Sequence, residues 1–438
     1  MIADSSLAFN HSKINRLLLN LLHAESDETG LPVKDFSDQD WDQFIQASTQ
    51  QGISGLLSAR IRQSAHVAEI PARVTEELHQ LGLQIALRNL RLYRELHKIL
   101  AALKEADIPV IVMKGMFMAQ GVYGDLASRS MGDIDILVRA EDINRADAWI
   151  RQSGYTWVDE KGGWDTYIQK DYHVFYYLSS MRVHLELHWN LNFPSSPFFL
   201  NMGELWDRAL PTRIAGVDVL TFSPEDLLLT SSLHIAYHHS FDGFALRSLY
   251  DIALILAQYQ AQIDWQQVQQ LSQQWGSTHC TYLVLRLAQD LLGASIPNSA
   301  LNALEPQNFD PRYILWAEER IFSELDPTNR PGGHPTLSYR FGGVWAPQGW
   351  KKRLSSLLRA CFPPLTTLAE LYGLPPHSRR LFLYYPVRLI DLVRKFASSA
   401  WLFFKKDRAT VNWVDWEGKR ASLEAWMTPD KDKRPPSA

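Results

Sequence analysis

A short apolar segment with acids at alternate positions places the strongest constraint on the fold. In residues 133–138, DIDILV, Asp133 and Asp135 alternate with isoleucine, leucine and valine. Successive side chains of a β-strand point to opposite faces. Both carboxylates are therefore expected on one face and the branched apolar side chains on the other. The alternation predicts a strand with an acidic face rather than a helix.

A second predicted strand, RVHLELHW over residues 182–189, alternates in the same way. His184, Glu186 and His188 fall on one face, and apolar side chains fall on the other. Like charges on one face repel each other, which indicates a neighbouring cation, and Mg²⁺ prefers carboxylate oxygens and substrate phosphates. Three carboxylates can hold two Mg²⁺ about 4 Å apart, as in phosphoryl transfer. The alternative is that both acidic faces are simply solvated.

Lys114 and Gly115 follow the β-branched run at 108–112, where a predicted strand turns into a predicted helix. Glycine lets the backbone approach a ligand, and a helix N-terminus offers free N–H groups to a phosphate. Lys114 adds a positive charge at the same point. Taken alone, the pair favours an ordinary strand–helix turn.

Other charged side chains permit both a binding role and a structural one. Arg129 suits phosphate geometry, but it also suits a salt bridge to Asp125 or Asp133. Arg247 and Asp251 have i,i+4 spacing on a predicted helix, which favours an ion pair on the helix surface. A second interpretation makes Asp251 a buried anchor for Arg247 or for a histidine.

Three histidines are candidate functional groups. His188 can hold Glu186 in place, act as an acid or base, or pack beside Trp189. His234 and His238 are four residues apart on a predicted helix, a spacing that can present two ligands to zinc. No glutamate lies between these two histidines as in a metalloprotease helix, and no third ligand is evident, so packing is favoured.

The order of these features resembles the uncharacterised nucleotidyltransferase family related to the DNA polymerase beta superfamily. The resemblance is densest over residues 108–190 and continues more weakly over 225–256. The matching residues are Lys114, Gly115, Tyr123, Gly124, Asp125, Arg129, Met131, Asp133, Asp135, Glu186, His188 and Trp189.

The resemblance implies an enzyme that transfers a nucleoside monophosphate from a nucleoside triphosphate to an acceptor with the help of Mg²⁺, two ions being expected. It makes Asp133 and Asp135 the metal-binding and catalytic pair. Glu186 becomes the third metal-binding acid, able to help activate the acceptor hydroxyl. Lys114 and Gly115 lie beside the triphosphate, as Arg129 is also expected to do.

One position departs from the superfamily's pattern. The usual Gly-Ser after the first strand is Gly115-Met116 here, so the hydroxyl that commonly meets a phosphate is missing. The departure favours a rival hypothesis, a non-catalytic nucleotide-binding or interaction module with the same fold. A third hypothesis is a toxin-like enzyme that modifies a protein or a tRNA.

The resulting expectation is an α+β fold, a small mixed-sheet nucleotidyltransferase core of the DNA polymerase beta type embedded in helical segments. We expect a helical segment at 1–107, the catalytic core at 108–222, a helical domain at 223–330, and a basic, partly helical region with a disordered tail at 331–438.

Charge and hydrophobicity restrict the setting and the partners. The formal net charge of -4 argues against a long nucleic-acid substrate. The acceptor is therefore expected to be a small molecule, a sugar, a peptide or a protein. Two cysteines without paired spacing, and the absence of a signal peptide or an apolar run of about 18 residues, indicate the cytoplasm. The basic and apolar stretch 379–406 fits either peripheral contact with a membrane surface or packing on the protein.

Overall fold

The computed structural model describes residues 11–24, 30–158, 163–323, 358, 361–372, 375, 378–392, 394 and 408–429. The chain divides into two compact units, Met1–Ile314 with Thr428–Ala438, and Leu315–Met427. The seven-stranded sheet described below and the candidate site belong to the first unit. The expected border at 330 and the tail from 430 onward lie outside the described residues.

The first unit begins with the helices α1 (Lys13–Leu22), α2 (Asp38–Gln50), α3 (Ser54–Gln63) and α4 (Ala72–Glu105). A capping box starts α2: the Ser37 hydroxyl accepts from the Asp40 N–H, and the Asp40 carboxylate accepts from the Ser37 N–H. Helices α3 and α4 approach closely at two glycines. A Cβ on Gly55 would lie 3.4 Å from Gly82 Cα and 1.9 Å from the Ala127 carbonyl oxygen. A side chain at position 55 would collide with the loop at Ala127, which precedes the candidate site. Only glycine therefore lets α3 and α4 pack against this loop.

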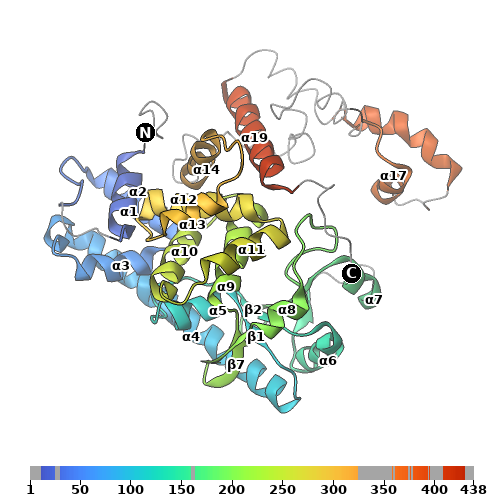
Figure 1. Cartoon of the computed structure of the whole chain (residues 1–438), viewed down its shortest axis with the longest axis horizontal. Helices are drawn as coiled ribbons and strands as arrows, with labels where there is room; N and C mark the ends of the chain where they lie inside the picture. Colours follow the sequence, from blue (N-terminus) through green and yellow to red (C-terminus); the bar gives the residue numbers. More distant parts are fainter. Residues whose placement is uncertain are drawn as a thin grey trace. The chain divides into compact units, whose positions relative to one another are not determined.

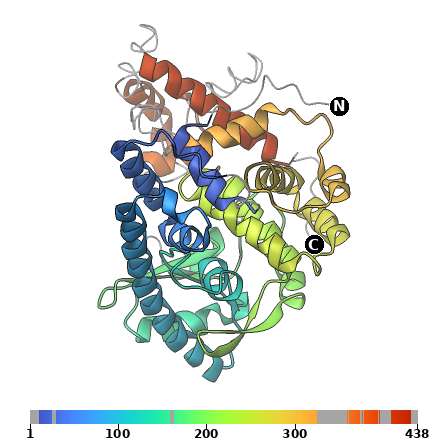
Figure 2. The same ribbon diagram turned by 90° about the vertical axis from the view of Figure 1, so that its left-hand side faces the viewer.

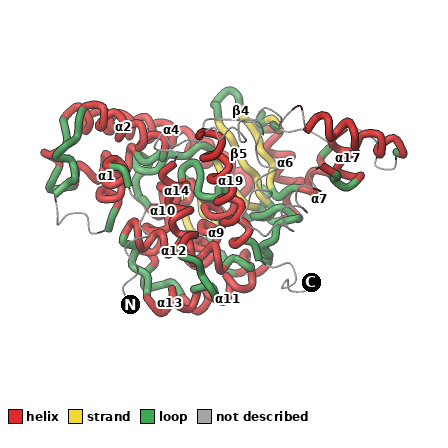
Figure 3. The backbone as a smooth tube through the Cα atoms, turned by 90° about the horizontal axis from the view of Figure 1, so that it is seen from above, coloured by secondary structure: helices red, strands yellow, loops and turns green. Residues whose placement is uncertain are grey.

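A seven-stranded mixed sheet follows, with the strand order β3-β4-β5-β2-β1-β7-β6 (Figures 1 and 3). Its strands are β1 (Ile111–Val112), β2 (Ile134–Leu137), β3 (Thr156–Trp157), β4 (His173–Leu178), β5 (Val183–His188), β6 (Leu210–Ile214) and β7 (Val217–Thr221). The pairs β2/β5 and β1/β7 are parallel, and the other pairs are antiparallel. The two acidic segments predicted from the sequence are thus neighbouring, parallel strands.

Short helices connect the strands. They are α5 (Lys114–Phe117), which continues into the π-helical turn η2 (Met118–Val122), α6 (Ile143–Gln152), α7 (Trp164–Lys170) and α8 (Met202–Asp207). Helix α6 buries Ala146 and Ile150, and the Tyr176 hydroxyl of β4 donates to Asp147 on the same helix. The hydrogen bond ties α6 to the sheet, and Figure 3 shows the helix beside the strands.

Helices return after the sheet, as the sequence predicts (Figure 2). They are α9 (Pro224–Leu233), the π-helical turn η4 (His234–His238), α10 (Ala245–Tyr259), α11 (Trp265–Trp275), α12 (Thr278–Leu292), α13 (Asn298–Leu304) and α14 (Arg312–Ser323). Ser223 caps α9 by accepting from the Asp226 N–H, and Pro224 occupies the first turn. The π-helical turn extends α9 and carries His234 and His238 at its two ends.

The second unit contains most of α14, α17 (Leu365–Tyr372), the 3₁₀ turn η5 (Arg379–Leu383) and α19 (Arg408–Met427). Leu381 of η5 packs with Leu368 and Ala369 of α17 in a small buried cluster. Next to it, Phe382 and Leu383 are exposed. The described start of the 379–406 stretch therefore has one side packed and one side open.

The structure confirms the predicted fold class, because a mixed sheet lies among many helices. The hairpin of β6 and β7 is not among the predicted strands. Its outer strand is mostly exposed, and Pro211 and Arg213 interrupt the alternation there. The turn between β6 and β7 contains Ala215 and Gly216, both with positive φ. Positive φ is unusual for alanine, so the residue type at position 215 does not indicate this turn.

Candidate active site

The register between β2 and β5 brings two acids side by side. Asp135 is the direct partner of Glu186 across this parallel pair. Side chains of directly paired residues leave the sheet on the same face, so the two carboxylates are neighbours. On the opposite face Ile134 and Ile136 are completely buried. The apolar half of each strand therefore fixes the direction in which its acids point.

Lys114 lies between these two acids. Its Nζ is 2.6 Å from Asp135 Oδ1 and 3.4 Å from Glu186 Oε2. Burial opposes the ammonium charge, but the Asp135 and Glu186 carboxylates outweigh burial and raise the pKa of Lys114. Its backbone has φ 45°, a left-handed conformation that costs about 1 kcal/mol or more in a residue with a Cβ. The strained residue is thus the one that follows β1 and whose ammonium contacts Asp135 and Glu186.

His188 completes the cluster from the end of β5. Its Nε2 lies 3.3 Å from Asp135 Oδ1 and 3.1 Å from Glu186 Oε2, and its ring stacks on His173. Although burial opposes the charge of Asp135, Lys114 and His188 hold the pKa of this carboxyl well below its ordinary value. Ligand atoms of Asp135, Glu186 and His188 all lie within 4.8 Å of one another. Two oxygens and one imidazole nitrogen are thus arranged so that one metal ion can bind them.

Asp133 precedes β2 and lies outside this closest group of ligand atoms. Burial, together with the carboxylates of Asp135 and Glu186, raises the pKa of Asp133 to about 7. Near neutral pH this carboxyl is therefore only partly ionised. Burial is the larger cause of the shift, and the two neighbouring carboxylates add to it.

One cavity of about 620 Å³, a volume typical of small-molecule sites, is lined by every residue that the sequence assigned to a catalytic, metal-binding or nucleotide-binding role. These residues are Lys114, Gly115, Arg129, Asp133, Asp135, Glu186 and His188. The side chains of Tyr172, Phe193 and Phe244 also line it. The cavity thus combines an acidic centre with aromatic walls.

Two of these residues have clear structural partners. Arg129 Nη2 lies 2.7 Å from Asp251 Oδ2, and both side chains are buried. The Tyr123 hydroxyl donates to the same carboxylate at 2.8 Å. A Cβ on Gly115 would lie 2.8 Å from Arg129 Nη1, so packing of the arginine requires glycine there. Asp251 is thus a buried anchor, but its partner is Arg129. The interpretation of Arg247 and Asp251 as an ion pair is wrong, since Arg247 instead donates to Ser130.

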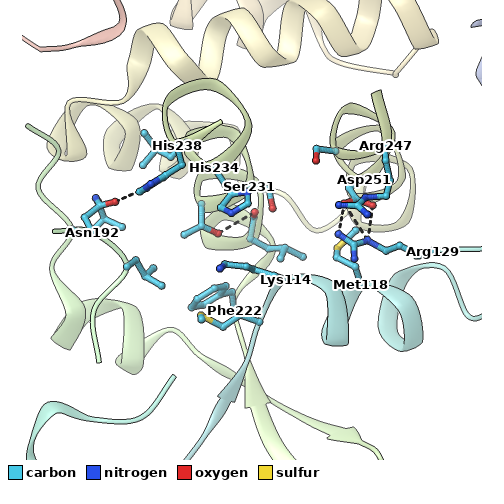
Figure 4. Close-up of a pocket in the computed structure, with 17 residues that line it drawn as sticks. Lys114, Met118, Arg129, Asn192, Phe222, Ser231, His234, His238, Arg247 and Asp251 are labelled. Atoms are coloured by element: carbon cyan, nitrogen blue, oxygen red, sulfur yellow. Dashed lines mark hydrogen bonds and ion pairs between the residues drawn. The ribbon is translucent and has the colours of Figure 1, made fainter. Parts of the chain in front are cut away.

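A second cavity of about 100 Å³ shares Lys114, Arg129, His234, His238 and Arg247 with the first. Its other walls are largely apolar, with Met113, Phe222 and Leu227 among them. Figure 4 shows Lys114 reaching into it from the strand side and the two histidines from the helical side. The two π-helical turns supply Met118, His234 and His238 to these walls, and such turns are frequent at functional sites.

The histidines of η4 do not belong to the metal-binding group found in the described part of the chain. His238 Nε2 lies 3.0 Å from Asn192 Oδ1, and the His234 ring contacts those of His238 and His239. Burial lowers the pKa of His234 well below its ordinary value, and burial with the nearby Lys114 ammonium lowers the pKa of His238 to about 4. Both rings are therefore neutral at pH 7. Asn192 was not anticipated, because nothing in its local sequence distinguishes it.

Comparison with protein families gives a match over residues 37–293, to a family described as an uncharacterised nucleotidyltransferase. The chain belongs to this family. The match includes the helices α2 to α4, the whole sheet and α9 to α12. Neither the curated proteins nor the solved structures contain a match. Family membership supports transferase activity in general.

Within the described ranges, the helices lack the length and apolar character needed to cross a membrane.

Proposed function

We propose that this chain is a Mg²⁺-dependent nucleotidyltransferase of the DNA polymerase beta type. It would transfer a nucleoside monophosphate from a nucleoside triphosphate to a small molecule, sugar, peptide or protein. The observation that supports this most is the direct pairing of Asp135 with Glu186, in a cavity that also contains Asp133. The family to which the chain belongs supports the same reaction class.

The acidic cluster fits a divalent cation. Carboxylate oxygens are the ligands that Mg²⁺ prefers, and an imidazole nitrogen such as His188 Nε2 is a ligand for several divalent metals. We propose Asp133, Asp135 and Glu186 as the metal-binding acids, with His188 as support. A bound cation would supply positive charge to the phosphate oxygens of the donor.

In the structure, Lys114 forms ion pairs with the two carboxylates that would bind the cation. Its ammonium ends a flexible four-carbon chain, so it can turn toward a phosphate without backbone movement. The loss of the superfamily's serine at Met116 is compatible with this role. Met116 is completely buried, and its carbonyl accepts from the Tyr93 hydroxyl. This position anchors α5, and Lys114 beside it provides the cation.

The proposed reaction can be written in terms of bonds. An acceptor oxygen forms a bond to the α-phosphorus of the donor, the bond from that phosphorus to the bridging oxygen breaks, and pyrophosphate leaves. The acceptor hydroxyl gives its proton to the Glu186 carboxylate, which is only partly buried and faces the cavity. The developing negative charge lies where Lys114 can approach it.

The test uses nucleoside triphosphates labelled on the α-phosphate and, in parallel, on the γ-phosphate. Each of the four common nucleoside triphosphates, in both labelled forms, is incubated with the purified chain, Mg²⁺ and fractionated cell extract. We expect the α-label to join an acceptor and pyrophosphate to appear, while Asp135→Asn does neither. Asp207→Asn, which removes an exposed acid on α8, is the matched control and should behave as wild type.

Three results would count against this proposal. Transfer of the γ-label would indicate a phosphotransferase. Mg²⁺-dependent binding without transfer of either label would indicate a non-catalytic nucleotide-binding module. Equal transfer by Asp135→Asn would remove Asp135 from the mechanism.

A further inference from the structure

The cations that line the large cavity differ in whether they are already paired. Among its lining residues, Lys114 is bound to Asp135 and Glu186, and Arg129 is bound to Asp251. The other two are Arg88 and Arg247. Within the described residues, neither of these arginines forms an ion pair with a carboxylate.

Arg247 is the more enclosed of the two. Its Nη1 donates to the Ser130 carbonyl at 3.0 Å and to the Ser130 hydroxyl at 3.2 Å, and its guanidinium lies 4.3 Å from the centre of the Phe244 ring. Its Nε is buried and has no hydrogen-bond partner in the part of the chain that is described. Burial, followed by the Arg129 guanidinium, lowers the pKa of Arg247 to about 10. The fold therefore encloses a cation and leaves one of its donors free.

Enclosing a cation without a counter-charge is unfavourable. A fold keeps such a residue where a ligand supplies the missing charge, and arginine suits phosphate because its planar donors can bind two oxygens at once. Arg247 lines both cavities, so its free surface faces the space that a ligand would fill. The Ser130 and Phe244 contacts hold the guanidinium in place before any ligand arrives.

Arg88, on α4, approaches the same loop from the other side. Its Nη2 lies 3.5 Å from the Gly132 carbonyl oxygen, and its side chain is exposed. Ser130 and Gly132 are two residues apart, which spans at most about 7 Å. Both arginines therefore contact the segment that leads directly into Asp133. Among the described residues neither arginine forms an ion pair with these acids, although the carboxylates of Asp251 and Asp133 partly offset the effect of burial on Arg247.

We propose that Arg247, assisted by Arg88, binds the phosphates of the donor nucleotide. This inference rests on the proposed function. A triphosphate beside three carboxylates is repelled by them. It therefore needs a cation that is not already paired with those carboxylates. Arg247 provides it from α10, so the helical half of the first unit contributes directly to the donor site.

Calorimetry with Mg²⁺ and either inorganic tripolyphosphate or each of the four nucleoside triphosphates tests the assignment. Arg247→Met keeps the contact with Phe244 but removes the charge. We expect it to weaken binding of tripolyphosphate and nucleotide about tenfold to a hundredfold, the effect of one charged hydrogen-bonding group. Arg247→Lys should recover part of the affinity, and Arg88→Met should lose less than Arg247→Met. Arg286→Met, which removes an arginine paired with Asp290 on α12, is the control and should bind as wild type.

Thermal unfolding without ligand separates binding from structure. If Arg247 is retained for a ligand, Arg247→Met should keep or raise the melting temperature, because it removes an enclosed charge. A structural arginine would show the opposite change. If the methionine variant does not fold, Arg247→Gln, which retains donors for Ser130, replaces it with the same expected loss of tripolyphosphate binding.

The outcomes also distinguish the two proposals. If wild type and Arg247→Met bind tripolyphosphate and nucleotide equally, the Arg247 assignment is overturned and the proposed function stands. If only the use of an acceptor is impaired in Arg247→Met, its anion belongs to the acceptor, and the assignment is again overturned. If wild type binds no nucleoside triphosphate in the presence of Mg²⁺, both proposals fail.

Discussion

Two buried charge clusters near α5 differ in how completely their charges are paired. In the first, Arg129 donates three hydrogen bonds to Asp251, at 2.7 to 3.2 Å, and Tyr123 donates a fourth. In the second, Lys114 and His188 share the carboxylates of Asp135 and Glu186 through single contacts.

The first cluster is closed, and the second is open. Asp251 is 5% exposed, and its carboxylate accepts hydrogen bonds from both Arg129 and Tyr123, as expected of a structural anchor. The second cluster has three acids for one lysine, and it faces a cavity of about 620 Å³. A buried charge thus indicates function when its partners are incomplete, and structure when they are complete.

The largest expected effect is on stability, from breaking the closed cluster. Asp251→Asn leaves Arg129 buried without a counter-charge, and removing one partner of a buried pair costs about 3–5 kcal/mol. Urea unfolding should show this loss. Asp290→Asn, in the exposed pair with Arg286, is the matched control and should cost under about 0.5 kcal/mol. Equal losses in the two variants would contradict the distinction between closed and open pairs.

The second effect is on activity, from breaking the open cluster. Asp135→Asn should reduce nucleotidyl transfer about a hundredfold or more, because a metal-binding charge is lost. In the structure the Lys114 ammonium stabilises the Asp135 charge. We therefore expect a loss of about 1–2 kcal/mol in unfolding free energy, smaller than for Asp251→Asn because Glu186 still faces Lys114. A larger stability loss than that of Asp251→Asn would make Asp135 a structural residue.

The third effect is on cation binding. Lys114 competes with a divalent cation for Asp135 and Glu186. Lys114→Met should therefore tighten the binding of Mn²⁺ alone by about tenfold, while it weakens the binding of nucleotide. Paramagnetic titration of free Mn²⁺ measures the first effect and calorimetry the second. Weaker Mn²⁺ binding in this variant would show that the acids do not form the metal site.

Alternation along single strands was enough to predict the acidic faces. The acids of 133–138 and 182–189 were assigned to one face each because Ile134, Ile136 and Leu187 require the apolar side. The family resemblance added the reaction class, and the family match agrees with it. The α+β fold class followed from the change of pattern after α4, where helical periodicity gives way to β-branched runs.

Pairings between distant residues could not be predicted in the same way. Arg129 meets Asp251 across 122 positions, whereas the sequence suggested nearer partners for both. Asp251 pairs with Arg129, and Arg247 has no ion pair with a carboxylate among the described residues. The spacing of residues along the chain does not predict this choice of partner. The register that sets Asp135 opposite Glu186 is likewise a property of the assembled sheet. Such contacts depend on tertiary packing rather than on local spacing.

The smallest expected effect concerns the helical wall of the cavities, where His238 is held neutral. Its folded pKa of about 4 lies below the value of about 6.5 for a histidine in an unfolded chain. As the pH falls from about 6.5 to 4, the unfolded chain therefore binds a proton that the folded chain does not. The free energy of unfolding should fall over this window. Groups that face His238 are Lys114, His173, His188 and His239, all of which oppose its protonation.

His238→Gln isolates this contribution, because the glutamine amide can still donate to Asn192 while it cannot bind a proton. The side chain is open to the cavity, where solvent screening reduces the effect, so we expect about 1 kcal/mol. Between pH 7 and pH 5, wild type should lose this much more unfolding free energy than the variant, as measured by urea unfolding at each pH. His97→Gln, on the exposed side of α4, is the control and should follow wild type. If the wild-type and His238→Gln curves run parallel, His238 is protonated as easily in the fold as outside it, and the helical wall carries a positive charge at acidic pH. The helical side of the cavity would then carry a second positive charge besides Arg247. The charge of Arg247 alone would no longer explain where the phosphates of the donor bind.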